Sequence, residues 1–260
     1  LYLFYEILSL STYPLVTHHQ DEEARISGRK YLTYILGTSI GLVLPAMILC
    51  YNIAGTLEFA QGGIFGAGIS QPMAMGLLLV FLFGFAKAAI MPLHGWLPAA
   101  MVAPTPVSAL LHAVAVVKVG VFSLVRVMTG IFGIDLLGSM GLGTVAGTIA
   151  AVTILVGSLI AMSQDELKRL LAFSTVSQLS YIVLGVALLT PKGMIGGVIH
   201  ILMHAFGKIT LFFCAGAIMV HTGKKHVSQM KGLGRQMPLT FFAFFIGSLS
   251  VIGLPPTGGF

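Results

Sequence analysis

Residues 72–103 decide the fold: they read PMAMGLLLVFLFGFAKAAIM from 72 to 91 and PLHGWLPAAMVA from 92 to 103. The first part is an apolar run of about 20 residues, the length that an α-helix needs to cross the ~30 Å hydrocarbon core of a bilayer. It carries Lys87 and is followed by Pro92 and Pro98, and proline interrupts a helix because it lacks a backbone N–H. We therefore predict one membrane crossing, Pro72–Ala103, that breaks near Pro92 and continues as a short helix around Trp96–Val102.

Other apolar runs repeat this pattern along the chain. Hydrophobic residues make up 57% and charged residues 8% of the 260 residues, whereas soluble domains carry about a quarter charged residues. A chain so poor in charge cannot cover a water-facing surface, so lipid must be its main solvent. We predict an all-α, multi-pass transmembrane helix bundle with proline-broken helices, forming one domain over residues 1–260. Besides the broken crossing, spans are expected at Tyr2–Thr17, Tyr31–Ala54, Pro106–Met128, Gly141–Met162, Leu170–Leu189 and Gly193–Val220, and an eighth begins at Pro238.

Basic residues in the loops predict the orientation of the chain. With strict alternation of the spans, nine of them lie on one side and two on the other. Short cytoplasmic loops carry an excess of Lys and Arg, so the first side should be cytoplasmic. The nine are Arg25, Arg29, Lys30, Lys168, Arg169, Lys224, Lys225, Lys231 and Arg235, and the two are Arg126 and Lys192.

Several other classes of site are disfavoured. The 14 basic residues outnumber the 8 acidic ones. This does not indicate nucleic-acid binding, because the basic residues are split between loops and apolar runs. Cys50 and Cys214 each stand alone in an apolar run, which indicates core thiols rather than a disulfide or metal ligands. A glycine pattern at 141–146 fits a dinucleotide motif but follows no predicted strand. We therefore expect no metal, no cofactor and no nucleic-acid partner, and the sequence shows no redox site.

Ionisable residues within the apolar spans are the strongest functional signal. A lysine or carboxylate at the centre of a membrane helix costs about 2.5–3.5 kcal/mol on insertion scales, so several of them need a compensating role. The expected role is a path for protons or ions that faces the bundle interior or a hydrated cavity. The alternative is that long side chains near helix ends reach out to the interface. The candidates are Glu6, Lys87, His112, Lys118, His200, His204 and Lys208.

Three of these residues, His200, His204 and Lys208, recur every four positions. This spacing stacks them on one helix face, about 6 Å apart. Such a row suits proton transfer through side chains and water, because histidine titrates near neutral pH. Packing histidines, or a pair that binds a metal or haem, are the alternatives.

Prolines give a second signal. A membrane helix broken by proline frees backbone polar groups, which are tolerated only where protein or water meets them. Discontinuous helices beside a charge are typical of ion-coupled transporters, although a single proline more often only bends a helix. The prolines expected to break helices are Pro92, Pro104, Pro106, Pro255 and Pro256.

Four stretches resemble the antiporter-like subunits of respiratory complex I, membrane-bound hydrogenases and Mrp-type cation/proton antiporters. They are residues 85–98 (FAKAAIMPLHGWLP) with 103–113 (APTPVSALLHA), residues 165–178 (DELKRLLAFSTVSQ), residues 204–208 (HAFGK) and residues 255–260 (PPTGGF). The similarity runs over the whole chain. Residues 5–11 (YEILSLS) and 28–31 (GRKY) look closest to the D-type member of the Mrp branch.

The resemblance implies a role for each ionisable residue in the spans. Glu6 corresponds to the family's acidic residue in its fifth helix, and Lys87 and Lys118 to the lysines of the broken seventh helix and of the eighth. His112 corresponds to a histidine of some members, and the 200–208 row to the central polar axis. The resemblance also implies that the family's first four helices and its twelfth-helix exit residue lie outside this sequence. We therefore expect a chain truncated at both ends.

These observations give one functional prediction and two alternatives. We expect a proton-translocating membrane subunit of a cation (Na⁺)/proton antiporter complex, working with other membrane subunits in the cell membrane of a prokaryote. A carboxylate near a buried lysine favours its protonated form, so moving Glu6 away from Lys87 would release that proton. The first alternative is a proton-pumping subunit of an NADH:quinone oxidoreductase or hydrogenase. In that case the chain would be part of an enzyme complex, and the sequence does not decide this. The second is a membrane protein that binds haem or quinone through its histidines.

Overall fold

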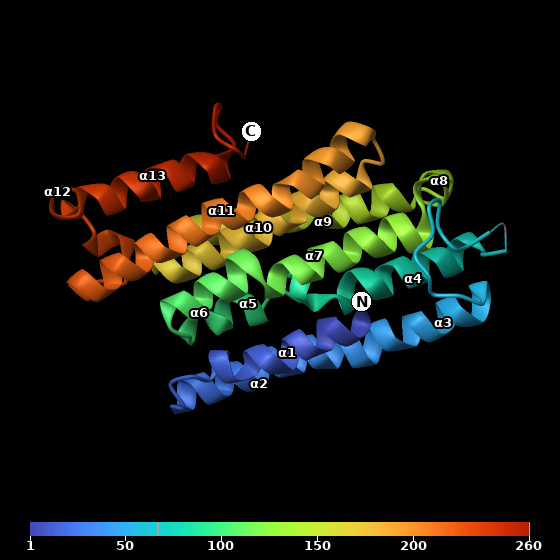
Figure 1. Cartoon of the computed structure of the whole chain (residues 1–260), viewed down its shortest axis with the longest axis horizontal. Helices are drawn as coiled ribbons and strands as arrows, with labels where there is room; N and C mark the ends of the chain where they lie inside the picture. Colours follow the sequence, from blue (N-terminus) through green and yellow to red (C-terminus); the bar gives the residue numbers. More distant parts are fainter. Residues whose placement is uncertain (67, 260) are drawn as a thin grey trace.

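The structure, a computed structural model, describes residues 1–66 and 68–259, and within these ranges every regular element is helical (Figure 1). The predicted all-α transmembrane fold is confirmed. Five helical stretches are long and apolar enough to cross a membrane, and two shorter apolar helices accompany them. The five are Glu22–Ala54, Thr105–Phe132, Leu142–Met162, Leu167–Ala187 and Pro191–Thr222, and the two are Gln71–Gly84 and Pro238–Ile252.

Most elements follow one another with short connections, and the longest connection joins α3 to α4. In the first half they are α1 (Tyr2–Val16), α2 (Glu22–Thr38), η1 (Ser39–Val43), α3 (Leu44–Ala54), α4 (Gln71–Gly84), η2 (Ala86–Ala88), α5 (Trp96–Ala99), η3 (Ala100–Val102), α6 (Thr105–Ala109), η4 (Leu110–Val114), α7 (Val116–Val127) and η5 (Met128–Phe132). In the second half they are α8 (Ile134–Ser139), α9 (Leu142–Met162), α10 (Leu167–Ala187), α11 (Pro191–Thr222), η6 (Val227–Gln229), α12 (Leu233–Gln236) and α13 (Pro238–Ile252).

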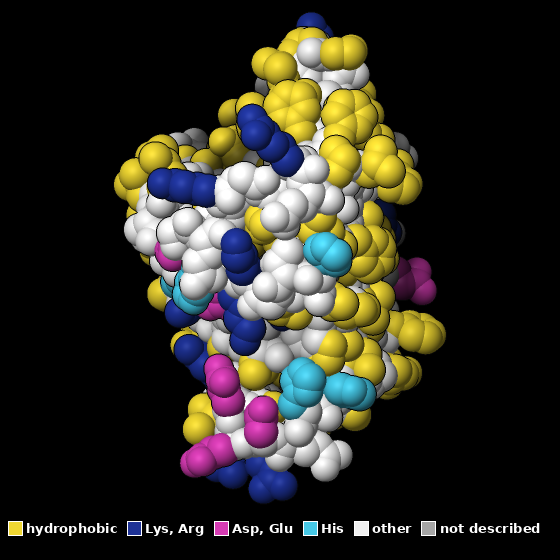
Figure 2. Space-filling model, turned by 90° about the vertical axis from the view of Figure 1, so that its left-hand side faces the viewer, with side chains coloured by type: hydrophobic (Ala, Val, Ile, Leu, Met, Phe, Trp, Pro, Cys, Tyr) yellow, Lys and Arg dark blue, Asp and Glu magenta, His cyan; other side chains and the backbone are white. Residues whose placement is uncertain are grey.

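The helices run back and forth along one direction, so their ends gather at two opposite faces of the bundle (Figure 1). The α1–α2, α5–α6 and α9–α10 connections and α12 lie at one end, which we call the basic end. The α3–α4 segment, α8 and the α10–α11 turn lie at the other. Figure 2 looks onto the basic end, where Lys, Arg, Asp, Glu and His side chains gather. The alternation that the loop charges required is therefore present, and the cytoplasmic assignment of the basic end stays a prediction.

The predicted broken crossing is present, but its break lies earlier than expected. Helix α4 ends at Gly84, before Lys87, and the chain resumes a helical course at Trp96. Pro92 cannot donate to the carbonyl one turn back, and its ring would clash with that carbonyl. Pro92 therefore disfavours a regular α-helix in the turn before it, and in that turn Ala89 adopts a left-handed backbone conformation (φ 55°). Lys87 thus lies inside the break, on η2, and not in the helix that leads to it.

Other predicted boundaries also shift for physical reasons. The second span was predicted from Tyr31, but its helix begins at Glu22, where the side chain of Asp21 caps it by accepting a hydrogen bond from the Ala24 amide (2.7 Å). At the next break, Pro104 is the N-cap of α6 and Pro106 lies in its first turn, where a missing N–H costs little. Pro255 and Pro256 follow α13 in the motif at 255–260, whose last residue, Phe260, lies outside the described residues.

Candidate functional site

The ionisable residues predicted from the sequence are largely buried within the bundle. A buried charge needs partners, so the contacts of these side chains indicate what they can do. They come from α1, the break at η2, the helix η4–α7 and the long helix α11. Exposed fractions are 0% for Lys87, His112 and Lys208, 2% for His204 and 7% for Lys118, and Glu6 and His200 are partly buried.

Lys87 is held by α1. Its ammonium donates to the backbone carbonyl of Tyr5 and lies 3.4 Å from the centre of the Tyr5 ring, a cation–π arrangement. The break itself is tied from the other side, because the indole N–H of Trp96 donates to the carbonyl of Ala86 (2.8 Å). The Ala86 carbonyl of the break thus accepts from a side chain as well as from the Ala89 amide (2.9 Å), which keeps it satisfied, as a membrane interior requires.

Gly120 lets helix α7 approach this break closely. A Cβ at this position would collide with the backbone of Lys87 and Ala88. Helix α7 carries Lys118 two residues earlier. Gly120 therefore allows the helix that bears Lys118 to pack against the segment that bears Lys87. Nothing in the sequence alone marks this glycine as important.

Glu6 lies beside this group but is not paired with Lys87. Its Oε1 accepts a hydrogen bond from the Ser39 hydroxyl, at the first residue of the π-helical turn η1, and its Oε2 is buried without a hydrogen-bond partner. Among the described residues no Glu6–Lys87 ion pair within 4 Å is present. Tyr5, the neighbour of Glu6 in the chain, instead contacts the lysine. The sequence suggested a direct pair of Glu6 with Lys87. In the structure Lys87 contacts Tyr5 instead, and the Glu6 carboxylate belongs to the next residue of the chain.

Lys118 and His204 contact each other directly within the polar axis. The Lys118 ammonium contacts Nδ1 of His204, joining α7 to α11, and Nε2 of His204 is buried without a hydrogen-bond partner. The ring of His200 lies 6.0 Å from that of His204, one turn along α11. The i, i+4 spacing therefore does place both rings on one face.

Helix α10 supplies the partners for both ends of the row on α11. Gln178 faces Nε2 of His200 with its Oε1 (2.8 Å) and donates from Nε2 to the carbonyl of Val251 on α13 (3.1 Å). Lys208 donates to the Leu171 carbonyl (3.0 Å) and to the Ser174 hydroxyl (2.8 Å). Gln178 and Ser174 were not predicted as site residues, although both lie in the family-like stretch 165–178.

His112 stands apart from these contacts. Its ring lies between the rings of Trp96 (centroids 6.4 Å apart, 18° between planes) and Phe212 (5.6 Å, 27°). Both ring nitrogens are buried without a hydrogen-bond partner, and the residue belongs to the π-helical turn η4. Such turns inside helices are frequent at functional sites. The structure therefore joins Lys118, His204 and His200 in a row but connects neither His112 nor Lys87 to it by a direct hydrogen bond.

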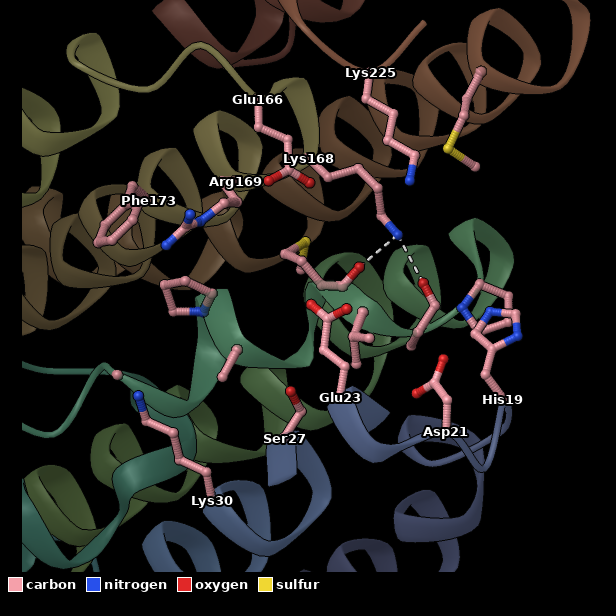
Figure 3. Close-up of a pocket in the computed structure, with 18 of the residues that line it drawn as sticks. His19, Asp21, Glu23, Ser27, Lys30, Glu166, Lys168, Arg169, Phe173 and Lys225 are labelled. Carbon is pink, nitrogen blue, oxygen red and sulfur yellow. Dashed lines mark hydrogen bonds between the residues drawn. The ribbon is translucent and has the colours of Figure 1, made fainter. Parts of the chain in front are cut away.

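Two cavities lie toward opposite ends of the bundle, and the second is lined by His200 of this axis. The one at the basic end has a volume of about 720 Å³, and its lining includes Phe173 (Figure 3) and His94, whose rings lie 6.1 Å apart. The one near the α10–α11 turn has a volume of about 420 Å³ and is lined by His200, Gln178 and several glycines. Charged and titratable residues around the first cavity are His19, Asp21, Glu23, Lys30, His94, Glu166, Lys168, Arg169 and Lys225.

At the basic end, outside the membrane spans, hydrogen bonds join two loop segments through Asp165 and Ser228. The carboxylate of Asp165 accepts hydrogen bonds from the Ser228 amide (2.9 Å) and hydroxyl (2.8 Å), and His226 Nδ1 lies 3.4 Å from it. The two bonds from Ser228 hold the pKa of Asp165 below its usual value. This contact ties the α9–α10 turn to the segment before α12.

The described residues contain no cluster of side chains suited to bind a metal ion. No group of three or more His, Cys, Asp or Glu side chains in these ranges could hold an ion, and Cys50 and Cys214 are both free and buried. The ring nitrogens of His200 and His204 that have partners face the Gln178 amide and the Lys118 ammonium.

Comparison with known proteins identifies the family of the chain. The family model described as "NADH:quinone oxidoreductase/Mrp antiporter, TM" matches residues 1–260. Over 265 residues the chain is 38% identical to NADH-quinone oxidoreductase subunit N of Desulforudis audaxviator, covering 100% of this chain and 52% of the relative. It is 36% identical over 278 residues to Na(+)/H(+) antiporter subunit A1 of Staphylococcus saprophyticus, covering 100% of this chain and 34% of the relative.

A solved structure agrees with these relatives. A chain of the Mrp complex from Dietzia sp. superposes with a TM-score of 0.87 at 30% identity, covering 98% of this chain and 47% of that one. The present chain thus spans about half of the relatives it matches, or less. With its helices, its broken crossing and its buried lysines, the chain belongs to the transmembrane family shared by NADH:quinone oxidoreductases and Mrp antiporters.

Proposed function

We propose that this chain is the proton-carrying core of a membrane subunit in a cation/proton antiporter complex, acting as one unit over residues 1–260. One observation carries the proposal: five ionisable side chains are buried among apolar helices, with two cavities toward opposite ends of the bundle. Ionisable groups buried in membrane helices mark proton and ion paths. The similarity to an Na(+)/H(+) antiporter subunit supports the antiporter role and Na⁺ as the exchanged cation.

The contact between Lys118 and His204 can hold and pass one proton. Two like charges in direct contact repel strongly in a medium of low dielectric, so only one of the two groups carries the proton at a time. Transfer from Lys118 to His204 moves charge from α7 to α11, and His200 lies next in the row, at the second cavity. Water completes the remaining gaps.

The opposite side of the axis begins at the cavity of the basic end. His94 lines that cavity, and His112 lies deeper, between Trp96 and Phe212. A proton entering here would reach Lys118 and Lys87 through His112 and intervening water. The path so proposed includes His94 besides the residues expected from the sequence.

Glu6 and Lys87 provide the coupling, acting through Tyr5. The Lys87 ammonium lies on the Tyr5 carbonyl and ring, and Glu6 adds a nearby negative charge that favours the protonated lysine. A movement of α1 that shifts Tyr5 and Glu6 together would withdraw both influences. This would release the proton toward the axis, so α1 is the element through which another subunit could drive transport.

A second candidate is a subunit of a redox-driven proton pump. The similarity to an NADH-quinone oxidoreductase subunit supports it, and it would use the same path. The haem- or quinone-binding alternative has less support, because the partnered ring nitrogens of His200 and His204 face Gln178 and Lys118. For either candidate we place the subunit in a prokaryotic cell membrane with other membrane subunits.

The test uses the full-length protein in its complex, in everted membrane vesicles that report internal acidification by a dye. For an antiporter, adding NaCl to acidified vesicles should release protons, and Lys118→Met should abolish this release. A redox-driven pump would instead acidify the vesicles upon NADH oxidation, without a Na⁺ requirement, and lose this in the same variant. Equal proton movement in wild type and Lys118→Met under both regimes would reject the proton path.

A further inference from the structure

The corner between η3 and α6 lacks the backbone donors that would close it. Chain direction reverses here, and the 3₁₀ course of the preceding residues pairs each carbonyl with the amide three positions later. For Met101 that position is Pro104, which has no N–H to donate. Ala103 ends the 3₁₀ turn with an extended backbone (ψ 154°), so its carbonyl leaves this pattern, and among the described residues no backbone amide donates to either carbonyl. Buried carbonyls without a partner are costly, so other donors must satisfy this corner.

Lys168 supplies them from another helix. Its ammonium donates to the carbonyls of both Met101 and Ala103, at 2.7 Å each, and the Ser108 hydroxyl adds a longer bond to Ala103 (3.2 Å). Figure 3 shows the lysine reaching from the start of α10 across the cavity to these two oxygens. Hydrogen bonds from a charged donor are about twice as strong as neutral ones. The corner is therefore fastened to α10 by one side chain.

The corner sits between two residues of the candidate path. Trp96 precedes it on α5 and His112 follows it on η4, and their rings stack. On its other side the corner packs on α11. Thr105 lies so close to Gly216 that a side chain at position 216 would collide with it. A small displacement of the corner would therefore change how the two rings meet.

We propose that Lys168 is a positioning residue, which supplies the donor that the carbonyls of Met101 and Ala103 lack from the backbone and so fixes the stacking of Trp96 on His112. Trp96 also holds the carbonyl of Ala86, beside Lys87, so the same lysine steadies the break. The structural part of the proposal stands alone, and only its consequence for transport rests on the proposed function.

The matched control is Arg169, the next residue. It lines the same cavity, and its side chain makes no hydrogen bond or ion pair within the described residues. Lys168→Met and Arg169→Met remove the same charge from the same cavity, but only the first removes the contact with the corner. Lys168→Arg keeps a charged donor within reach and should rescue.

The readout is the ¹⁹F spectrum of full-length protein labelled with 5-fluorotryptophan, with the Trp96 signal identified by its loss in Trp96→Phe. Lys168→Met should move or split this signal by more than its linewidth, Arg169→Met should leave it in place, and Lys168→Arg should restore it. If Lys168→Met does not accumulate in membranes, Lys168→Gln, whose side chain is shorter, should give the same displacement.

Two results would overturn the proposal: an unmoved Trp96 signal in Lys168→Met or Lys168→Gln, or an equal displacement in Arg169→Met. Proton transport by the same preparations should fall several-fold in Lys168→Met alone. A displaced signal with transport unchanged would leave the positioning role intact and count against the proposed path through His112.

Discussion

The ammonium of Lys118 contacts Nδ1 of His204, so that α7 and α11 meet through two side chains that can each hold a proton. Both residues are buried. The second ring nitrogen of His204 has no hydrogen-bond partner among the described residues and is free to bind a proton or a water molecule. In the proposed path, this arrangement would let the histidine take a proton on one side and pass it on from the other.

Substituting His204 by Gln tests that function. Glutamine keeps an oxygen that accepts from Lys118, but it does not titrate. We expect proton transport to slow by about 10²-fold or more, the scale of losing a positioned proton-transfer group. Bound metal and visible absorption should not change. The measurement is the initial rate of proton movement in vesicles with equal protein levels.

His221→Gln provides the control for that prediction, since His221 lies exposed near the end of the same helix. It should transport at the wild-type rate. A haem band or a stoichiometric transition metal that is present in the wild type and lost in His204→Gln would contradict the relay and favour a cofactor-binding protein.

Lys87→Met should abolish transport while the complex still assembles. Methionine fills a similar volume, leaves the Tyr5 ring packed and removes the ammonium that contacts the Tyr5 carbonyl and ring. Lys192→Met is the matched control, because it removes an exposed lysine at the far end of the bundle. Transport is measured in vesicles and assembly by co-purification of the other subunits. Near-normal transport in Lys87→Met would remove this lysine from the mechanism.

The sequence predicts the spans well because their cause is local. About 20 apolar residues must form a helix in lipid, since no other local structure satisfies the backbone there. The same rule failed at the start of α2, because the capped turns before Tyr31 are too polar to register as a span. Helix caps, and not the apolar run, set that boundary.

The partners of the buried charges could not be predicted, because they depend on packing between distant segments. Tyr5 and Lys87 are 82 positions apart, and Lys118 and His204 are 86 apart. Glu6 seemed the natural partner of Lys87 by charge alone, yet Glu6 bonds to Ser39 and Lys87 bonds to Tyr5. Gly120 and Trp96 determine how the break packs, and neither residue type signals this in a single sequence.

Orientation is tested by placing single cysteines at the two ends of the bundle. His19→Cys, Ser163→Cys and Gln229→Cys lie at the basic end, and Ser139→Cys lies at the other. None of these changes alters the Lys and Arg distribution that sets topology. In intact cells an impermeant thiol reagent should label only Ser139→Cys, and permeabilisation should expose the rest. Labelling of the basic-end cysteines from outside would show that the assignment is inverted.

Asp165 gives a prediction of pH dependence outside the membrane spans. Its pKa is lowered by the hydrogen bonds from Ser228, so its contribution to holding the segment before α12 is complete above the ordinary aspartate pKa of about 3.9. The contribution is lost as the pH falls through the lower pKa of the folded state. His226 also faces this carboxylate. The Ser228 amide should therefore stay protected from hydrogen exchange at neutral and mildly acidic pH and lose protection only in strong acid.

Asp165→Asn should lower the protection of the Ser228 amide already at neutral pH and remove its dependence on acid, since a neutral amide accepts more weakly and does not titrate. The Val227 amide is the internal control, because it donates to the backbone carbonyl of residue 165 (2.7 Å), which the substitution leaves in place. Protection factors, corrected for the intrinsic effect of pH on exchange, are compared for the two amides in each protein. If the Ser228 and Val227 amides lost protection together in Asp165→Asn, the side chain would be holding the whole segment. An Asp165→Asn protein with the wild-type pH profile at Ser228 would show that the carboxylate does not anchor this end of the bundle.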